Sequence, residues 1–240
     1  MLARMGIEVW RARGAEHEAA PAEAFESSAP SLVAPRDSGA SPLDSGASPL
    51  AMDWPELAAC VAACTRCELH QGRTQTVFGV GDREARVLVI GEAPGAEEDR
   101  RGEPFVGRAG QLLNAMLAAV GMARETVYIA NILKCRPPQN RDPKAEEVLA
   151  CSPYLERQIA LIEPTLILAV GRIAAQNLLQ VETPIGRMRG QLHSYGNRSI
   201  PVVVTYHPAY LLRSPGEKRK AWDDLRFALA TLRAREALRA

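Results

Sequence analysis

The sequence predicts an α/β fold of three layers, α/β/α, in which a central sheet of four mainly parallel strands lies between helices. Four short runs are apolar without interruption, which is typical of parallel strands that are buried on both faces. Segments with the periodicity of helices separate these runs, so that strands and helices alternate along the chain. Polar, glycine and proline residues gather after most of the runs, at the edge of such a sheet where ligands bind.

The expected elements follow in chain order from residue 53. The segment WPELAACVAAC has helical spacing, and GQLLNAMLAAVG is a helical pattern that a glycine ends. The helices are expected at 54–64, 110–121, 144–163, 172–179 and 217–237, the last of them amphipathic and basic. The strands are expected at 86–91 (RVLVIG), 126–133 (TVYIANIL), 165–171 (TLILAVG) and 201–208 (PVVVTYHP).

Residues 1–52 differ from the rest in composition. They are rich in Ala, Ser, Pro and Gly, and DSGASPL occurs twice in tandem, at 37–43 and 44–50. Such a composition buries too little apolar surface to offset the entropy of ordering. We therefore expect a disordered tail over 1–52 and one folded domain over 53–240, with Met52 as an alternative start of the chain.

Composition and charge limit the classes of protein. The chain has 240 residues with 47% hydrophobic content, as globular proteins do, and its apolar runs are too short for a transmembrane helix. The N-terminus lacks the apolar core of a secretion signal, so we expect a cytoplasmic protein. Residues 172–240 carry 12 Lys/Arg and 5 Asp/Glu, a net charge of +7. This charge indicates either a docking face for a polyanion or a solvated basic helix.

Four of the five cysteines have the spacing of a metal site. Cys64 and Cys67 are separated by two residues, so both thiolates can face one metal, and Cys135 and Cys151 can complete fourfold ligation. Cys60 lies one helical turn before Cys64 and is expected to stand outside the site. The spacing alone does not distinguish zinc from an iron–sulfur cluster, and four separately buried thiols are the alternative.

The segment after the first strand, GEAPGAEEDRRGEPFVG (91–107), is acidic where a phosphate-binding loop would not be. It carries five acids and lacks the Gly-Lys-Ser/Thr ending of a nucleotide loop, which disfavours a Rossmann-like nucleotide enzyme. Phe105 stands in this segment among polar residues. Its ring serves either to stack on a planar ligand or as a small hydrophobic anchor.

Further candidates follow two other strands. His207 can stabilise an anion or serve as a structural histidine. Asn131 offers a donor and an acceptor that match the N3–H and O4 edge of uracil, or it ties down the backbone. Leu211 and Leu212, beside Arg213, have the character of a wedge that enters a stack of bases.

Four motifs, taken together with the cysteines, resemble the family 4 uracil-DNA glycosylases, the iron–sulfur type of bacteria and archaea. The motifs are GEAPGAEED, EPFVGRAGQLL, YIANILKCRPPQNRDP and VTYHPAYLLR, and the resemblance runs from about Trp54 to Leu232. It implies a four-stranded parallel sheet between helices, and a [4Fe-4S] cluster on Cys64, Cys67, Cys135 and Cys151. It also places around a flipped uracil Gly91, Glu92, Ala93, Phe105, Asn131 and His207.

The implied activity is DNA repair by a monomeric enzyme that hydrolyses the N-glycosidic bond of uracil in single- or double-stranded DNA. Carboxylates near the sugar would stabilise its oxocarbenium-like charge, and His207 would stabilise the charge on uracil O2. The loop has Ala93 where the most active families carry an aspartate that activates water. Asn140 and Glu98 are therefore the candidates to orient water, and Glu98 is also a candidate to crowd the methyl group of thymine.

For DNA contact, Leu211 would fill the gap that the flipped base leaves, and Arg213 would contact the backbone. A non-catalytic iron–sulfur or zinc module that binds nucleic acid is the alternative function. Such a module has no need to combine Asn131, Phe105 and His207. A relative that traps uracil covalently through a loop histidine is disfavoured, because RPPQNRDP after Cys135 contains no histidine.

Overall fold

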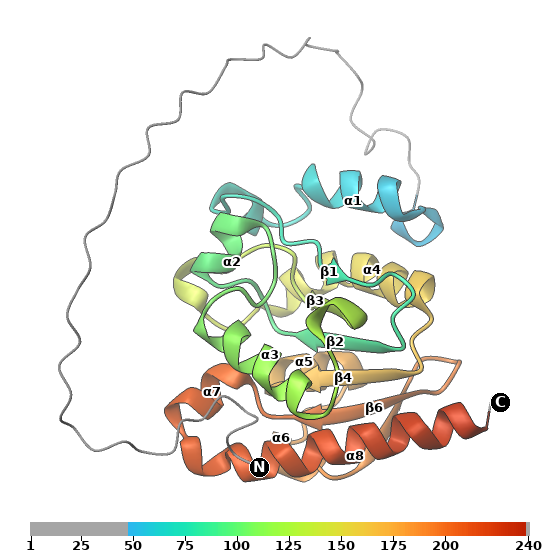
Figure 1. Cartoon of the computed structure of the whole chain (residues 1–240). Helices are drawn as coiled ribbons and strands as arrows, with labels where there is room; N and C mark the ends of the chain where they lie inside the picture. The colour runs from blue at the N-terminus through green and yellow to red at the C-terminus, as the bar shows by residue number, and fades with distance from the viewer. Residues whose placement is uncertain (1–47, 239–240) are drawn as a thin grey trace, which may run out of the picture.

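The computed structural model describes residues 48–238, which form a six-stranded sheet. Helices lie on both faces of this sheet (Figure 1). The strands are β1 Val80–Gly81, β2 Val87–Gly91, β3 Tyr128–Asn131, β4 Leu166–Val170, β5 Leu192–Tyr195 and β6 Ile200–Thr205. Their order across the sheet is β1-β3-β2-β4-β6-β5. The four inner strands are parallel, whereas β1 and β5 pair antiparallel at the two edges.

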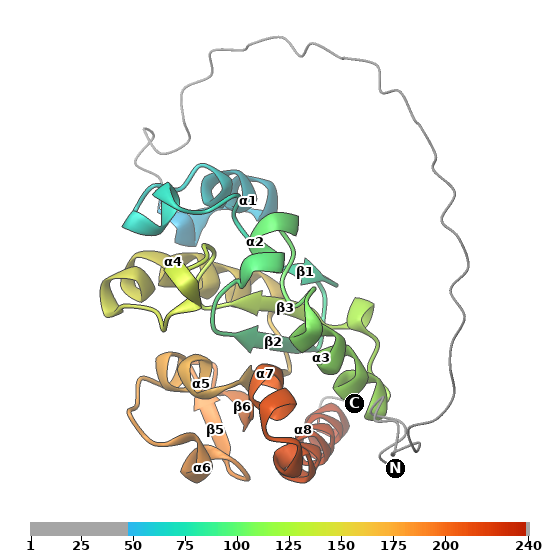
Figure 2. The same ribbon diagram turned by 90° about the vertical axis from the view of Figure 1, so that its left-hand side faces the viewer.

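Eight α-helices accompany the strands in the described part of the chain. They are α1 Trp54–Ala62, α2 Ala96–Arg101, α3 Arg108–Ala119, α4 Ala145–Ile162, α5 Arg172–Leu179, α6 Ile185–Met188, α7 Pro208–Arg213 and α8 Lys218–Ala237. Short 3-10 turns lie at η3 Pro49–Ala51, η4 Glu68–Gln71, η5 Arg124–Thr126, η6 Pro138–Asn140 and η7 Pro215–Glu217. In the view of Figure 2, α5 and α6 lie on one side of the sheet and α3 and α8 on the other.

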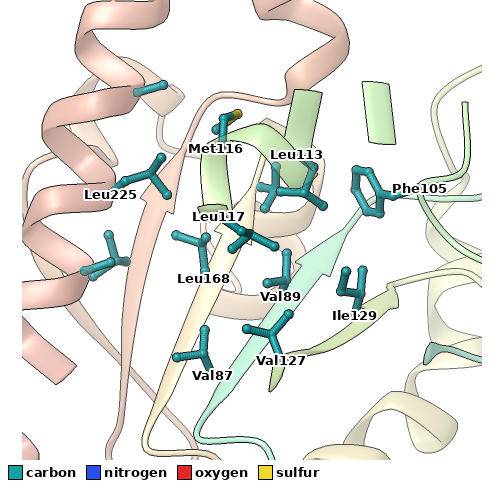
Figure 3. Packing of buried hydrophobic residues seen from close by; sticks show 14 of the residues in the cluster. Val87, Val89, Phe105, Leu113, Met116, Leu117, Val127, Ile129, Leu168 and Leu225 are labelled. Atoms are coloured by element: carbon teal, nitrogen blue, oxygen red, sulfur yellow. The ribbon is translucent and has the colours of Figure 1, made fainter. Parts of the chain in front are cut away.

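Alternate residues of the inner strands supply the two main cores. On one face Val89, Ile129 and Leu168 pack with side chains of α3 and α8, as Figure 3 shows for Leu113 and Leu225. On the other face the neighbouring strand positions pack with α4 and α5. Burial on both faces explains why these strands are continuously apolar in the sequence.

The three-layer α/β class is confirmed, and the number of strands differs from the expectation. The four expected strands are the four inner ones, while β1 and β5 were missed. Two segments expected as loops contain the short helices α2 and α7. Each is one to two turns long, too short for a periodic pattern to reveal it.

The described residues begin at Ser48, five residues before the expected start of the domain. Residues 48–52 are described, and η3 packs against α4. Met52 is buried, and its carbonyl accepts a hydrogen bond from Arg157 Nε. The rest of the expected tail, residues 1–47, lies outside the described residues. Among the described helices, none is long and apolar enough to cross a membrane.

Candidate active site

The segments that follow β2, β3 and β6 line a cleft of about 430 Å³. Because parallel strands present their carboxyl ends at one edge of the sheet, residues far apart in sequence meet there. Most of the side chains expected at the site line this cleft: Glu92, Ala93, Glu98, Phe105, Asn131, Asn140, His207 and Arg213.

Asn131, the last residue of β3, presents an acceptor that has no partner. The residue is 2% exposed, and its Oδ1 makes no hydrogen bond within the described structure. A buried acceptor in this state costs free energy until a donor arrives. Gly91, which pairs with Asn131 in the sheet, leaves room beside it. A Cβ at Gly91 would lie 2.5 Å from Asn131 Oδ1 and 2.6 Å from Phe105 Cζ.

The ring of Phe105 lies beside that of His207, the histidine that follows β6. Its ring centroid is 5.6 Å from that of His207, with the two planes tilted by 30°. The ring is nearly buried and belongs to the core beneath α3, beside Leu113 in Figure 3. Its backbone φ of +54° lies in the left-handed region that non-glycine residues rarely adopt.

His207 is the N-cap of α7, and its ring is fixed by the backbone. Its Nδ1 accepts a hydrogen bond of 3.1 Å from the N–H of Ala209. Since Nδ1 is an acceptor, the neutral ring carries its proton on Nε2 and can donate there. Burial, with a smaller effect from Arg213, lowers the pKa of His207 to about 4, so the ring is neutral at physiological pH.

Three of the five acids in 91–107 are paired with other groups of the protein and do not line the cleft. Glu97 pairs on the surface with Arg100 of its own helix α2. Asp99 is buried and accepts the backbone N–H of Thr74. Glu103 pairs with Arg124. Of the five acids, only Glu92 and Glu98 therefore line the cleft.

Glu98 lines the cleft, but its oxygens already accept three backbone hydrogen bonds. Oε1 accepts from Val106 N at 3.0 Å and Gly107 N at 3.1 Å, and Oε2 accepts from Gly95 N at 3.2 Å. A carboxylate engaged in this way fixes the loop that carries Phe105. The arrangement favours a positioning role over that of orienting water.

The carboxyl group of Glu92, by contrast, has a raised pKa. It is half-buried in the cleft, and burial raises the pKa of its carboxyl group to about 7. The negative charge of Asp142 acts in the same direction, and the positive charge of Arg172 opposes it. Arg172 itself pairs with Asp142 at 2.7 Å. The carboxyl group of Glu92 thus titrates near neutral pH beside the ligand space.

Asn140, the last residue of η6, also lines the cleft. It is exposed and has a φ of +55°. Its Oδ1 accepts from Arg136 Nε at 2.7 Å, which leaves the amide of its side chain to face solvent in the cleft.

The expectation that Leu211 forms a wedge is wrong. Leu211 has 0% exposure and packs in the core between α3 and α8, so it cannot enter DNA. Its neighbour Leu212 is 37% exposed. The sequence did not show that this segment is helical, and in a helix successive residues point in different directions. Arg213, at the end of α7, is exposed and lines the cleft.

The four cysteines of the expected metal site line a second cavity. Cys64, Cys67, Cys135 and Cys151 come from three separate segments, whereas Cys60 is buried and does not line this cavity. Arg73 Nη1 donates to Cys135 Sγ at 3.1 Å. Across residues 48–238, no set of three or more His, Cys, Asp or Glu side chains is gathered closely enough to hold a metal ion.

Lys134 makes hydrogen bonds both to a cysteine of the second cavity and to a residue of the cleft. Its backbone N–H donates to Cys151 Sγ at 3.3 Å. Its buried Nζ donates to the carbonyl of Asn131 at 2.9 Å and to Gln158 Oε1 at 2.6 Å. The strand end that carries Asn131 is thus fixed by the same residue that contacts a cysteine sulfur.

Sequence reasoning missed two larger side chains of the cleft, Tyr210 and Arg141. Both stand in motifs that the resemblance had singled out, so their positions were signalled but their role was not. Arg141 is held by Glu147, a buried carboxylate that also accepts the N–H of Lys144 at the start of α4. That ion pair lowers the pKa of Glu147.

Several known proteins are similar to this chain over most of its described residues. A model of the uracil-DNA glycosylase superfamily matches residues 78–226. The type-4 uracil-DNA glycosylase of Archaeoglobus fulgidus is 45% identical over 69% of this chain and 86% of its own length. Its namesake from Pyrobaculum aerophilum is 41% identical over 72% and 92%, and that of Thermotoga maritima 45% over 64% and 80%. The chain belongs to the uracil-DNA glycosylase superfamily and, within it, to the type-4 family.

Proposed function

We propose that this protein removes uracil from DNA by hydrolysis of the N-glycosidic bond, in the cleft at the ends of β2, β3 and β6. The observation that carries the proposal is the unpaired Oδ1 of Asn131, buried beside the rings of Phe105 and His207. An acceptor in that place matches the N3–H of uracil, and the amide Nδ2 can donate to O4. Cytosine lacks N3–H and carries an amino donor at position 4, so it leaves both groups unmatched.

Cleavage of the bond leaves negative charge on uracil and positive charge on the sugar. His207, neutral and protonated on Nε2, donates to uracil O2 as that charge develops. The carboxylate of Glu92 stabilises the sugar cation. Asn140 orients a water molecule, whose oxygen bonds to the sugar carbon as the N-glycosidic bond breaks. The proton that this water loses neutralises the departing uracil anion. Glu98 is less suited to that task, because three backbone donors already occupy its carboxylate.

DNA reaches the cleft from the side of α7. Leu212, the exposed leucine of that helix, fills the space that the flipped base vacates, in place of Leu211. Arg213 contacts a phosphate beside it. Both single- and double-stranded DNA present an extruded base to such a surface.

A glycosylase assay separates this function from that of a binding module. The purified protein is incubated with an oligonucleotide that contains one uracil, and alkali then breaks the strand at abasic sites. We expect strand breaks with uracil and none with cytosine or thymine at the same position. A protein that retains the uracil oligonucleotide on a gel and produces no breaks would support the binding module.

We also propose a [4Fe-4S] cluster on Cys64, Cys67, Cys135 and Cys151. Two observations support it: the thiols share one cavity, and N–H donors from Arg73 and Lys134 point at two of the sulfurs, as donors do around thiolate-ligated clusters.

When bound, the cluster supplies bonds that cross-link the segment after α1, the loop after β3 and helix α4. Anaerobically purified protein should be yellow-brown with about four irons per chain. Cys64→Ser and Cys151→Ser should lower the melting temperature, whereas Cys60→Ser should leave the iron content unchanged. Colourless protein with one zinc per chain would contradict the cluster.

A further inference from the structure

We infer that Arg124 is a positioning residue for uracil recognition, which holds the ring of Phe105 in place from outside the cleft. The inference rests on the proposed function, since it concerns how the same site binds uracil. Arg124 lies in η5, between α3 and β3, and faces a separate surface depression that it shares with Glu103 and Gly81. No motif of the sequence pointed to it.

Phe105 has a backbone conformation that does not form by itself. At φ +54° the residue pays for a left-handed geometry that a non-glycine side chain disfavours. Such geometry persists when the surrounding contacts determine it completely. The contacts around residues 103–107 therefore decide where the ring of Phe105 stands.

Arg124 supplies those contacts on one side of the loop. Its Nη2 donates to the carbonyl of Pro104 at 2.6 Å and to Glu103 Oε1 at 2.9 Å. Its Nη1 donates to the carbonyl of Phe105 at 3.3 Å and to Asn114 Oδ1 at 3.1 Å. The side chain is 15% exposed, so water competes weakly for these acceptors.

Glu98 supplies the complementary contacts on the other side. Its carboxylate accepts the N–H groups of Val106 and Gly107, directly after Phe105. The loop is thus held between a cation that binds its carbonyls and an anion that binds its amides. Gly110 lets α3 approach this backbone, because a Cβ there would lie 1.7 Å from the carbonyl oxygen of Phe105.

Loss of Arg124 would remove the donors to two consecutive carbonyls and let Phe105 return to an ordinary φ. The ring would then leave its place beside His207 and Gly91. Stacking on a base is sensitive to this position, and an aromatic ring that stacks typically changes affinity by about 5- to 100-fold.

The test compares Arg124→Met with Glu103→Ala, a matched control that removes the ion pair and leaves the guanidinium bonds to the carbonyls. We would measure the dissociation constant of free uracil base and the single-turnover rate on uracil DNA. Arg124→Met should weaken uracil binding about 5- to 50-fold, within the range of a lost stacking ring. Glu103→Ala should change it less than about twofold, as partly exposed ion pairs contribute little.

A double-mutant cycle with Phe105→Leu identifies the route of the effect. If Arg124 acts through the ring, Arg124→Met should weaken uracil binding far less in the Phe105→Leu background than in the wild type. Equal losses in both backgrounds would overturn the inference, as would wild-type uracil affinity in a folded Arg124→Met protein. If Arg124→Met does not fold, Arg124→Lys takes its place in the cycle, because a single ammonium group cannot reproduce the contacts of the planar guanidinium.

Failure of the proposed function is recognised separately. A wild-type protein that neither excises nor binds uracil would contradict the function before any variant is compared. A wild type that excises uracil, with an Arg124→Met variant of equal affinity for the base, would contradict the positioning role alone.

Discussion

At the scale of single residues, the ring of His207 combines two properties that suit an electrostatic role. Its Nδ1 is occupied by Ala209 N–H, and its pKa of about 4 keeps it neutral. A donor that strengthens in the transition state is typically worth about 10²–10³ in rate. His207→Ala should lower the single-turnover rate of uracil excision by that factor while DNA affinity stays nearly constant. Excision at the wild-type rate would remove His207 from the mechanism.

Asn131 should respond differently, because it reads the base. Asn131→Asp replaces the donor to O4 by an acceptor and keeps the shape of the side chain. Uracil excision should fall sharply, and some excision of cytosine should become measurable. The measurement is the ratio of the single-turnover rates on otherwise identical uracil and cytosine oligonucleotides. An unchanged ratio would show that Asn131 does not read the ring.

Glu92 should give the reaction its pH dependence. With a pKa of about 7, its carboxylate forms as the pH rises through neutrality, so the single-turnover rate should rise between about pH 6 and 8. Glu92→Gln should be slower and flat over that range. His207 adds no second step there, since its pKa lies near 4. A wild-type profile that stays flat from pH 6 to 8 would contradict the role of Glu92.

The same pKa has a consequence for stability. A carboxyl group whose pKa is higher in the folded than in the unfolded protein binds its proton more tightly when folded. Its contribution to the free energy of unfolding therefore declines as the pH rises from about 4.5 to about 7 and then stays constant. Glu92→Gln should gain melting temperature relative to wild type at pH 8 and not at pH 4.

At the scale of elements, α7 places two adjacent leucines in opposite environments. Leu211→Ala should lower the free energy of unfolding by about 2–5 kcal/mol, because it leaves a cavity in the core. Leu212→Ala should leave stability nearly unchanged and weaken binding to DNA that holds a flipped base. Thermal unfolding and DNA titration of the two variants separate these effects. Wild-type DNA affinity in the Leu212→Ala protein would show that Leu212 does not act as a wedge.

How far the sequence could predict these elements depends on their burial. The four inner strands are apolar on both faces and were recognised, whereas β5 alternates between exposed and partly buried residues and β1 has two residues. Helix α2 follows Gly95 and helix α7 begins at Pro208, residue types that are also typical of loops, and each helix has only six residues. The burial of Leu211 follows from helix α7, which the sequence pattern did not predict.

The sequence predicted which residues line the cleft better than it predicted the role of each residue. Asn131, Phe105 and His207 stand at strand ends or in a distinctive loop, and the structure brings them together. The tasks of the acids depended on partners far away in sequence, such as Arg124 for Glu103 and Thr74 for Asp99. No pattern within 91–107 contains those partners.

At the scale of the whole molecule, the N-terminal boundary can be tested by two truncations. A chain that begins at Ser48 should keep its melting temperature and glycosylase activity, as the composition of residues 1–47 predicts. A chain that begins at Trp54 loses the burial of Met52, about 1.5–3 kcal/mol, and the Asp53 cap of α1, about 0.5–2 kcal/mol. Its melting temperature should fall. Equal melting temperatures for the two chains would contradict this boundary.

The order of strands in the sheet also determines when the enzyme becomes competent during its synthesis. Gly91 and Asn131 lie on neighbouring strands, but β4 and β6 must join the sheet before His207 can stand opposite them. Contacts so distant in sequence form slowly, because long loops must close first. A nascent chain therefore has no working fragment of the site until residues beyond 207 have left the ribosome.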